Sequence, residues 1–588
     1  MCGINTIFRY GCLLDSDRET VRSMNREMLY RGPDDEGIWA DDRVVLGMRR
    51  LAIIGLKNGR QPLFNEDGTL VLVCNGEIYN FKELKKNLEC RGHLFKTESD
   101  CEVILHLYEE KGVGCLGTLV GMFGLVLWDS KNRVLLAARD PIGEKPVYFS
   151  EIPGGIVFSS ELKAISKYGL LRKNLDYNII RQILEYTYPV DMRQTFISQI
   201  RRLLPGEYAL VDHSGLRLKK FWKISFEPTY AGTRENARDD FLNLLNTSVN
   251  LRFQSDVPVA VMLSGGIDSS AVATIAAASR KEIHAITAGY RGAPDCDERM
   301  AAKSLAEKSG IHWHEVELDT GDFQTYFDEY TRFIDEPVAD PVCIPQWGIY
   351  KKARELGFKV LLNGTGGDEL FFGYPYHNVT AGQLETKRRL ASFLPIHREN
   401  LQAFGSFFSS QFHSFSKMGR YLFQDPIDYI PPFKNYWKSL PFKWPDDLGF
   451  RSPNPLEAYL HEAQNGPDQL SAILMSTWLP ANCLHISDKL GMGNSVEVRA
   501  PFIDHKLVEL VFSLPIEWRY SETEPKSFLK WVMQGILPQA VLCGPKKGFS
   551  TPDDFLQNLI RTHTGSVFGI CHRFFHTVVL EKVLAPYS

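Results

Sequence analysis

The sequence predicts two domains of different class: an α+β domain of stacked sheets, followed by an α/β domain with a parallel sheet. The chain has 588 residues, which is more than one hydrophobic core usually supports. Up to about residue 209, short apolar runs follow one another closely and are separated by turn residues. From residue 257 onward, apolar runs lead into Gly-rich turns and helical stretches. The first pattern is typical of packed β-sheets, and the second of strand–helix repeats.

In the first domain, which we place at residues 2–210, five apolar runs are expected to be strands. They lie at residues 43–48, 70–74, 122–128, 134–138 and 155–159. Residues 100–110 carry apolar side chains at helical spacing, which predicts a helix between the strands. The segment 211–235 contains a proline and a glycine and is predicted to be a linker.

The second domain is expected to span residues 236–588. Strands are predicted at 257–263, 283–288 and 359–362, and a helix is predicted to run from the turn at Gly265 to about residue 278. Strands that alternate with helices form parallel sheets, which bind ligands at the carboxyl ends of their strands. Residues 375–475 form an aromatic- and Pro-rich insert without a chemical motif, and we expect it to pack as helices against the sheet.

Composition and charge argue against nucleic-acid and membrane partners. With 44% hydrophobic and 23% charged residues, the chain falls in the ordinary soluble range, and a net charge of −4 leaves no basic excess for nucleic acid. The apolar runs are too short to span a membrane, the N-terminus does not read as a secretory signal, and the 11 cysteines show no framework spacing. We therefore expect a cytoplasmic protein that acts on small molecules, with no nucleic-acid or membrane partner. The sequence leaves the oligomeric state open, with a homodimer among the alternatives.

Cys2 directly follows the initiator methionine and is the first candidate nucleophile. Removal of that methionine would give one residue both a thiol and an α-amine. An α-amine titrates at about 7.7–8.0 and can serve as a base for the thiol. A cysteine at position two also arises by chance, so the assignment depends on its surroundings.

Other residues of the first domain suit the recognition of an amino acid. Arg50 stands before an apolar run, and its guanidinium can bind a carboxylate through two hydrogen bonds. Asn75 and Gly76 follow a strand, where an amide side chain and a backbone N–H can hold an oxyanion. Asp100 ends a segment that also reads as a helix N-cap, and its carboxylate can face a substrate ammonium.

These segments, together with residues 31–34, 139–143 and 145–148, closely resemble the class II glutamine amidotransferases. The resemblance implies an αββα sandwich of the N-terminal nucleophile hydrolase type that releases ammonia from glutamine. It assigns Cys2 as the nucleophile and Asn75 and Gly76 as the oxyanion hole. It also implies that Arg50 binds the α-carboxylate of glutamine, and that Glu77 and Asp100 bind its α-amine.

The second candidate site is the Gly-rich segment from Ser264 to Ser270, between a predicted strand and a helix. Glycines allow close backbone approach, and a helix N-terminus attracts anions. No lysine follows the glycines, so this is not the loop that transfers a γ-phosphate, whereas Asp268 suits Mg²⁺. A simple Gly-rich turn with a serine cap is the alternative. A second turn of this kind carries Asp368, and in a parallel sheet the two aspartates can share a metal.

The two turns resemble the ATP-pyrophosphatase domain of asparagine synthetases, a Rossmann-like α/β fold. Matches continue at Asp488, Met492, Ser495, Glu497, Arg499, Pro501, Phe502, Asp504 and residues 545–549, so the resemblance covers nearly the whole chain. It implies that ATP is cleaved to AMP and pyrophosphate through an acyl-adenylate, with Mg²⁺ at Asp268 and Asp368. The implied pyrophosphate ligands are Ser264, Gly265, Gly266, Asp268, Ser269 and Ser270. The implied adenosine contacts are Leu263, Ala288 and Gly364, while Lys546 would stabilise charge at the α-phosphate.

The implied reaction converts a carboxylic acid, glutamine and ATP into an amide, glutamate, AMP and pyrophosphate. A dry tunnel is expected between the domains, because only neutral ammonia attacks the adenylate. The sequence departs from the family at Thr365, where a glutamate usually stands between the two glycines. Threonine carries no charge at neutral pH, so the acceptor stays open between aspartate and another acid, such as a sugar uronate, a cell-wall amino acid or a secondary-metabolite acid.

Two other classes of protein fit the sequence less well. An intramolecular amide-forming cyclase of the β-lactam synthetase type lacks the cysteine, so the presence of Cys2 argues against it. A non-catalytic scaffold would be expected to have damaged phosphate turns, whereas Asp268 and Asp368 are both present.

Overall fold

The computed structural model describes residues 2–169, 171, 173–338, 340–393, 456–544, 551–564, 579 and 582–584. The N-terminal half is a sandwich of two six-stranded antiparallel sheets, ordered β10-β8-β9-β1-β3-β2 and β12-β11-β7-β6-β5-β4. Its strands are β1 (Gly3–Arg9), β2 (Asp35–Ala40), β3 (Val44–Arg50), β4 (Leu63–Phe64), β5 (Leu70–Ile78), β6 (Gly121–Asp129), β7 (Val134–Arg139), β8 (Tyr148–Ile152), β9 (Gly155–Ser159), β10 (Arg201–Arg202), β11 (Glu207–Asp212) and β12 (Gly215–Lys220).

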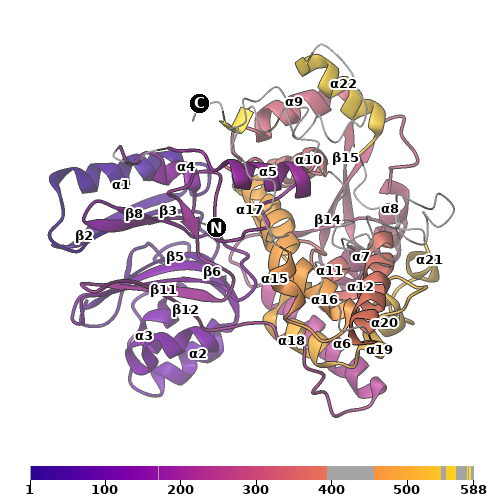
Figure 1. The fold of residues 1–588 in the computed structure, drawn as a ribbon, viewed down its shortest axis with the longest axis horizontal. Coiled ribbons are helices and arrows are strands. Elements are labelled where there is room, and N and C mark those ends of the chain that lie inside the picture. Colours follow the sequence, from indigo (N-terminus) through magenta and orange to yellow (C-terminus); the bar gives the residue numbers. More distant parts are fainter. Residues whose placement is uncertain are drawn as a thin grey trace.

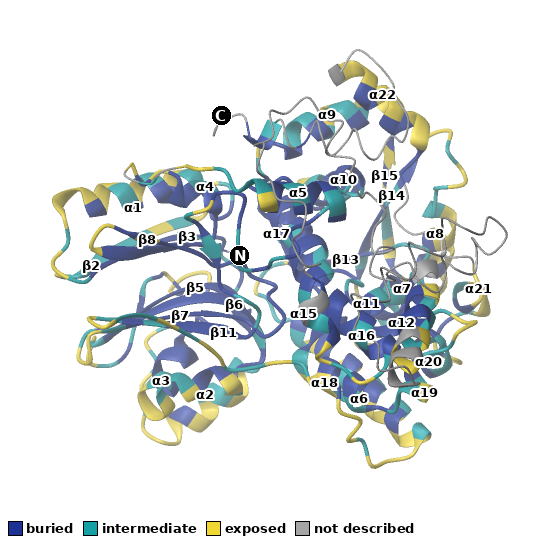
Figure 2. Ribbon diagram, viewed as in Figure 1, coloured by how far each residue is buried: buried dark blue, intermediate teal, exposed yellow. Residues whose placement is uncertain are grey.

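Helices cover both outer faces of the sandwich. In Figure 1, α1 and α4 lie above one sheet, and α2 and α3 lie below the other. The helices are α1 (Asp15–Glu27), α2 (Phe81–Glu89), α3 (Glu102–Lys111), α4 (Leu162–Ile165) and α5 (Tyr177–Tyr186). Buried side chains such as Ile4, Val73 and Val126 fill the space between the sheets, as the dark-blue strands of Figure 2 show. The predicted αββα sandwich is confirmed.

The C-terminal half is built on a five-stranded sheet of order β15-β14-β13-β16-β17, in which every pairing is parallel. Its strands are β13 (Val259–Met262), β14 (His284–Tyr290), β15 (His312–Leu318), β16 (Val360–Leu362) and β17 (Glu497–Arg499). Alternate residues of β13 face different cores: Ala260 and Met262 belong to one cluster, and Val261 belongs to the other. A parallel sheet buried on both faces confirms the α/β prediction.

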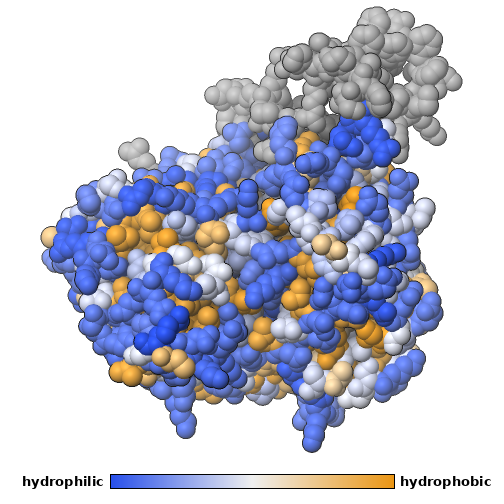
Figure 3. All heavy atoms as spheres, turned by 90° about the horizontal axis from the view of Figure 1, so that it is seen from below, coloured by the Kyte–Doolittle hydropathy of each residue, from blue (hydrophilic) through white to orange (hydrophobic). Residues whose placement is uncertain are grey.

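Helices surround this sheet, and their bounds are α6 (Arg234–Arg252), α7 (Ile267–Ser279), α8 (Arg299–Ser309), α9 (Thr320–Tyr330), α10 (Cys343–Glu355), α11 (Gly367–Phe371), α12 (Pro375–Phe393), α15 (Glu457–Leu460), α16 (Gly466–Ile473), α17 (Leu484–Gly493), α18 (His505–Ser513), α19 (Ile516–Arg519), α20 (Ser527–Val532), α21 (Gln539–Leu542) and α22 (Asp553–Thr564). None of the helices within the described ranges is long and apolar enough to cross a membrane. The face seen in Figure 3 is largely hydrophilic, with hydrophobic side chains scattered over it.

The structure describes the predicted linker and part of the predicted insert. The predicted linker 211–235 is wrong for Gly215–Lys220, which forms β12 and pairs along β11. Its alternating side chains complete an edge strand, and the turn at Gly215, with a φ of +110°, reverses the chain there. Of the insert 375–475, α12 and α16 pack on one another, while residues 394–455 lie outside the described residues. The remaining domain boundaries stay predictions.

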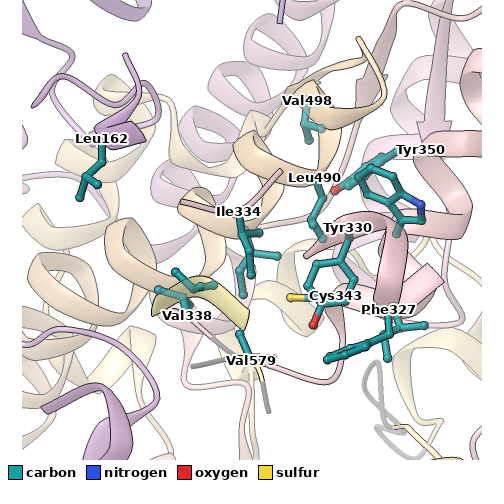
Figure 4. Close-up of a cluster of buried hydrophobic side chains, with 14 of the residues drawn as sticks. Leu162, Phe327, Tyr330, Ile334, Val338, Cys343, Tyr350, Leu490, Val498 and Val579 are labelled. Carbon is teal, nitrogen blue, oxygen red and sulfur yellow. The ribbon is translucent and has the colours of Figure 1, made fainter. Parts of the chain in front are cut away.

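The two halves share a continuous buried interface. Figure 4 shows part of a hydrophobic cluster in which Leu162 of α4 belongs together with Ile334, Val338 and Leu490 of the second half. Beside it, the guanidinium of Arg31 donates to Asp488 from Nη1 at 2.8 Å and from Nη2 at 3.2 Å. The N-terminal and C-terminal halves are therefore fixed against one another by apolar contact and by buried charge.

Candidate active sites

The first site lies where β1 meets β5, inside the sandwich. The Cys2 N–H donates to Asn75 Oδ1 at 2.9 Å, and the Cys2 carbonyl accepts from Arg31 Nε at 3.0 Å. Burial raises the pKa of the Cys2 thiol to about 11, although the Leu51 N–H and the charge of Arg50 act in the opposite direction. The thiol is therefore protonated at neutral pH, and its reaction requires a base.

Asn75 and Gly76 are consecutive residues of β5. The Nδ2 atom of Asn75 is buried and makes no hydrogen bond with any described residue. A buried donor without a partner is costly and often marks a ligand position. A Cβ at Gly76 would lie 2.2 Å from the carbonyl oxygen of Met122, so only glycine fits against the neighbouring strand β6.

Arg50, the last residue of β3, is held in one orientation. Its Nη2 donates to the carbonyls of Ile54 and Gly55, each at 2.9 Å. Gly59 packs against the same guanidinium, because a Cβ there would lie 2.5 Å from Nη2. The guanidinium is therefore held in place, and its remaining N–H groups are available for a carboxylate.

Glu77 and Asp100 form a buried acidic pair at the end of β5. The Ile78 N–H donates to Asp100 Oδ2 at 2.6 Å. Burial is the main cause that raises the pKa of Asp100 to about 6, and burial together with Asp100 raises the pKa of Glu77 well above its usual range. Arg499 of β17 approaches Glu77 with Nη2 at 3.4 Å. Such an environment favours the arrival of a cation.

The second site is a cavity of about 630 Å³ at the carboxyl ends of β13 and β16. This volume is in the usual range for a small-molecule pocket. Many of its lining residues come from the two Gly-rich turns: Ser264, Gly265, Gly266, Asp268, Ser269, Gly364, Thr365 and Asp368. The Ser264 N–H donates to Ser269 Oγ at 3.0 Å, which closes the first turn against the N-terminus of α7.

Lys526 joins the two predicted metal-binding aspartates. Its Nζ lies 2.6 Å from Asp368 Oδ1 and also pairs with Asp268. Burial opposes the charged amine, but the two carboxylates outweigh it and raise the pKa of Lys526. Sequence reasoning missed this lysine, because it stands in no Gly-rich motif. Its φ of +56°, unusual for a side chain with a Cβ, is visible only in three dimensions.

The donor set at Asp268 and Asp368 fits a divalent cation. Both carboxylates reach one cationic atom, and carboxylates together with substrate phosphates are the usual ligands of Mg²⁺. Two glycines leave room for these carboxylates. A Cβ at Gly367 would lie only 2.4 Å from Asp268 Oδ1, and a Cβ at Gly373 only 1.8 Å from Asp368 Oδ1, so any larger residue would collide with them.

Not every predicted residue reaches the cavity. Leu263, Ser270 and Ala288 are not among its described lining residues. Leu263 is buried and donates its N–H to the Ile286 carbonyl at 3.0 Å. Thr365 does line the cavity, and its N–H donates to Asn363 Oδ1 at 3.2 Å. Lys546 lies outside the described residues.

The two sites are joined through β17. Arg499, which approaches Glu77 of the first site, is fixed by Glu497 Oε1 at 2.6 Å and by the Arg252 carbonyl at 2.7 Å. The neighbouring strand β16 leads directly into the Gly-rich turn of the second site. Because Arg499 lies opposite Leu362, the carboxyl end of this strand pair carries both the contact to the acidic pair and the turn that lines the cavity.

Comparison with known proteins gives two family matches that together cover most of the chain. A glutamine amidotransferase domain matches residues 1–222, and asparagine synthase matches residues 240–567. Asparagine synthetase [glutamine-hydrolyzing] 1 of Bacillus subtilis is 29% identical over 94% of this chain and 87% of its own length. Asparagine synthetase [glutamine-hydrolyzing] 2 of the same organism is 30% identical over 93% of this chain and 72% of its own length.

Proposed function

This chain belongs to the asparagine synthase family, and on that premise we propose that it transfers ammonia from glutamine to a carboxylic acid activated by ATP. It is a ligase that forms carbon–nitrogen bonds and hydrolyses glutamine. The observation that carries the proposal is the presence, in one chain, of the buried Cys2–Asn75 contact and of the cavity between two Gly-rich turns.

In the first half-reaction, the Cys2 sulfur attacks the side-chain carbonyl of glutamine. The oxyanion accepts hydrogen bonds from Asn75 Nδ2 and the Gly76 N–H, ammonia leaves, and water then hydrolyses the thioester to glutamate. The α-amine of Cys2, exposed once the initiator methionine is removed, takes the thiol proton, because the raised pKa of the thiol requires a base. Arg50 binds the substrate α-carboxylate, while Glu77 and Asp100 bind its α-amine.

In the second half-reaction, an oxygen of the acceptor carboxylate attacks the α-phosphorus of ATP and displaces pyrophosphate. Ammonia then attacks the acyl carbon of the adenylate, and AMP leaves. The first Gly-rich turn, the N-terminus of α7 and Lys526 stabilise the pyrophosphate charge. Mg²⁺, when bound by Asp268 and Asp368, would neutralise phosphate charge. Lys546 is proposed to stabilise charge at the α-phosphate.

The acceptor is aspartate or a related acid, and Thr365 favours an alternative. The structure places Thr365 on the cavity wall, where the family's usual glutamate would add a carboxylate. The uncharged side chain at this one position suits a different acid, such as a sugar uronate, a cell-wall amino acid or a secondary-metabolite acid. The cytoplasmic location and a homodimer remain predictions.

Pyrophosphate release tests the reaction and the acceptor together. Purified protein with ATP, Mg²⁺ and glutamine is offered aspartate and the alternative acids in turn, and the amide product is identified by mass spectrometry. The expected result is pyrophosphate release that depends on one acid. A chain that produces no acid-dependent pyrophosphate with any acid, or no glutamate from glutamine, contradicts the proposal.

A Cys2→Ala variant separates the two half-reactions. Glutamine-dependent turnover is expected to disappear, whereas turnover supported by free ammonium is expected to persist. If glutamine-dependent turnover survives the substitution with ammonia-dependent turnover unchanged, Cys2 is not the nucleophile.

A further inference from the structure

A group of histidine and glutamate side chains converges around α3 in the first domain, and none of its members belongs to either active site. Glu66 comes from the β4–β5 loop, His93 from the loop after α2, and His106 and Glu109 from α3. Their candidate ligand atoms all lie within 4.8 Å of one another. In Figure 1, α2 and α3 form the lower edge of the domain.

The distances match the edges of a small coordination shell. Glu66 Oε1 lies 3.0 Å from His93 Nδ1, and Glu66 Oε2 lies 3.2 Å from His106 Nδ1. Glu109 Oε2 lies 3.9 Å from both Nδ1 atoms. Ligands about 2.0–2.1 Å from a tetrahedral ion are separated by about 3.3 Å, so little movement would close this set around a metal.

The buried ring of His106 supplies an independent indication of a ligand. His106 is completely buried, and its ring nitrogens face the carboxylates of Glu66 and Glu102 without a well-aligned hydrogen bond to either. Glu66 Oε2, 3.2 Å away, is likewise buried without a hydrogen bond. Two atoms that approach so closely without hydrogen-bond alignment are arranged like two ligands that point at a third atom between them. Without such an atom, these polar groups are buried at a cost.

Both histidines also have carboxylates behind them. Glu110 Oε1 lies 3.3 Å from His93 Nε2, and Glu102 Oε1 lies 3.7 Å from His106 Nε2. Metal-binding histidines commonly present the second ring nitrogen to a carboxylate, which fixes the ring and strengthens the ligand. Helix α3 therefore supplies two of the converging side chains, His106 and Glu109, and the two carboxylates behind the rings, Glu102 and Glu110.

We propose that Glu66, His93, His106 and Glu109 bind one Zn²⁺ ion as a structural site. Two imidazoles and two carboxylates suit zinc, whereas Mg²⁺ and Ca²⁺ prefer shells of oxygen alone. Four protein ligands leave no open position, which is typical of structural zinc. The ion would tie together three separate segments of the chain. Through His106 and Glu102 it would also stiffen residues 96–100, because Glu102 accepts the backbone N–H groups of Lys96 and Thr97.

Zinc content tests the proposal on the full chain, purified without a histidine tag. The expected result is one zinc per chain after desalting, measured by mass spectrometry of the metals, and a tetrahedral visible spectrum when Co²⁺ replaces it. Glu109→Gln is the main variant, because its side chain is 39% exposed and the substitution should not prevent folding. It is expected to weaken zinc binding by at least about 100-fold, since loss of an outer partner alone costs about 10–100-fold. His106→Gln should do the same.

His284→Gln is the matched control, since His284 forms a histidine pair with His314, Nδ1 to Nε2, at 3.0 Å in the other domain. It is expected to retain the zinc. Chelation should lower the melting temperature of the wild type and leave that of Glu109→Gln unchanged. A wild type without bound zinc, zinc that survives in Glu109→Gln, or zinc that is lost only in His284→Gln overturns the proposal.

Discussion

Arg31 offers a sharp test of how the two domains are held together. Its guanidinium is fully buried and contacts Glu161 Oε1 at 2.7 Å and Asp488 Oδ2 at 2.8 Å. Arg31→Met keeps an apolar chain of similar length but leaves two buried carboxylates with one cation fewer. Removing one partner of a buried ion pair costs about 3–5 kcal/mol, because the charges left behind are shielded from water. The counterions that stay are Lys489, 2.7 Å from Glu161, and Lys145, 3.8 Å from Asp488.

Lys359→Met is a matched control. Lys359 Nζ also pairs across the interface, with Asp34 Oδ2 at the same 2.8 Å, but both side chains are about one-third exposed. An exposed pair contributes about 0–1 kcal/mol. The two variants therefore differ in burial rather than in distance.

The assay is urea unfolding followed by tryptophan fluorescence, with the first transition compared between the variants. Arg31→Met is expected to be destabilised by about 3–5 kcal/mol and Lys359→Met by less than about 1 kcal/mol. Although burial acts against it, the positive charge of Arg31 contributes to lowering the pKa of Asp488 below its ordinary 3.8. The stabilisation by this ion pair is therefore present above pH 3.8 and is lost as the pH falls through the lowered pKa of Asp488. Equal shifts in the two variants would refute the reasoning.

Three further predictions concern the active sites. Arg50→Lys, which loses the fork, is expected to raise KM for glutamine by roughly 10–150-fold, equivalent to about 1.5–3 kcal/mol, while ammonia-dependent turnover stays unchanged. Lys526→Met is expected to lower acid-dependent pyrophosphate release about 10²–10³-fold and to spare glutaminase activity, whereas Lys351→Met, whose amine pairs with Glu329 at 2.8 Å away from the cavity, should affect neither. Because the pKa of Asp100 is raised to about 6, its carboxylate is protonated below that pH and cannot pair with an ammonium. Glutaminase kcat/KM should therefore fall as the pH drops through 6, and Asp100→Asn should abolish that step; a step that persists in Asp100→Asn removes Asp100 as its source.

Local sequence determined much of the fold. The strand expected at 155–159 coincides with β9, and those expected at 70–74 and 134–138 lie within β5 and β7. Period-two apolar alternation and Gly-rich turns act over a few residues, so a single sequence reveals them. Local patterns also led to the prediction of a linker where β12 lies. The glycine turn and the charged residues of this edge strand resemble a linker in sequence, and only the pairing with β11 identifies a strand.

The candidate site residues Cys2 and Asn75 and the Ser264–Ser270 turn could be proposed from the sequence alone, because each stands next to other residues of the same motif set. Only the tertiary structure decided which distant groups complete them. Lys526 reaches Asp268 across 258 positions of sequence, and Arg31 reaches Asp488 across 457. The cluster around His106 likewise draws on two loops and a helix. The physical reason is that electrostatic and coordination contacts depend on distance in space, to which the periodicity of a sequence gives no access.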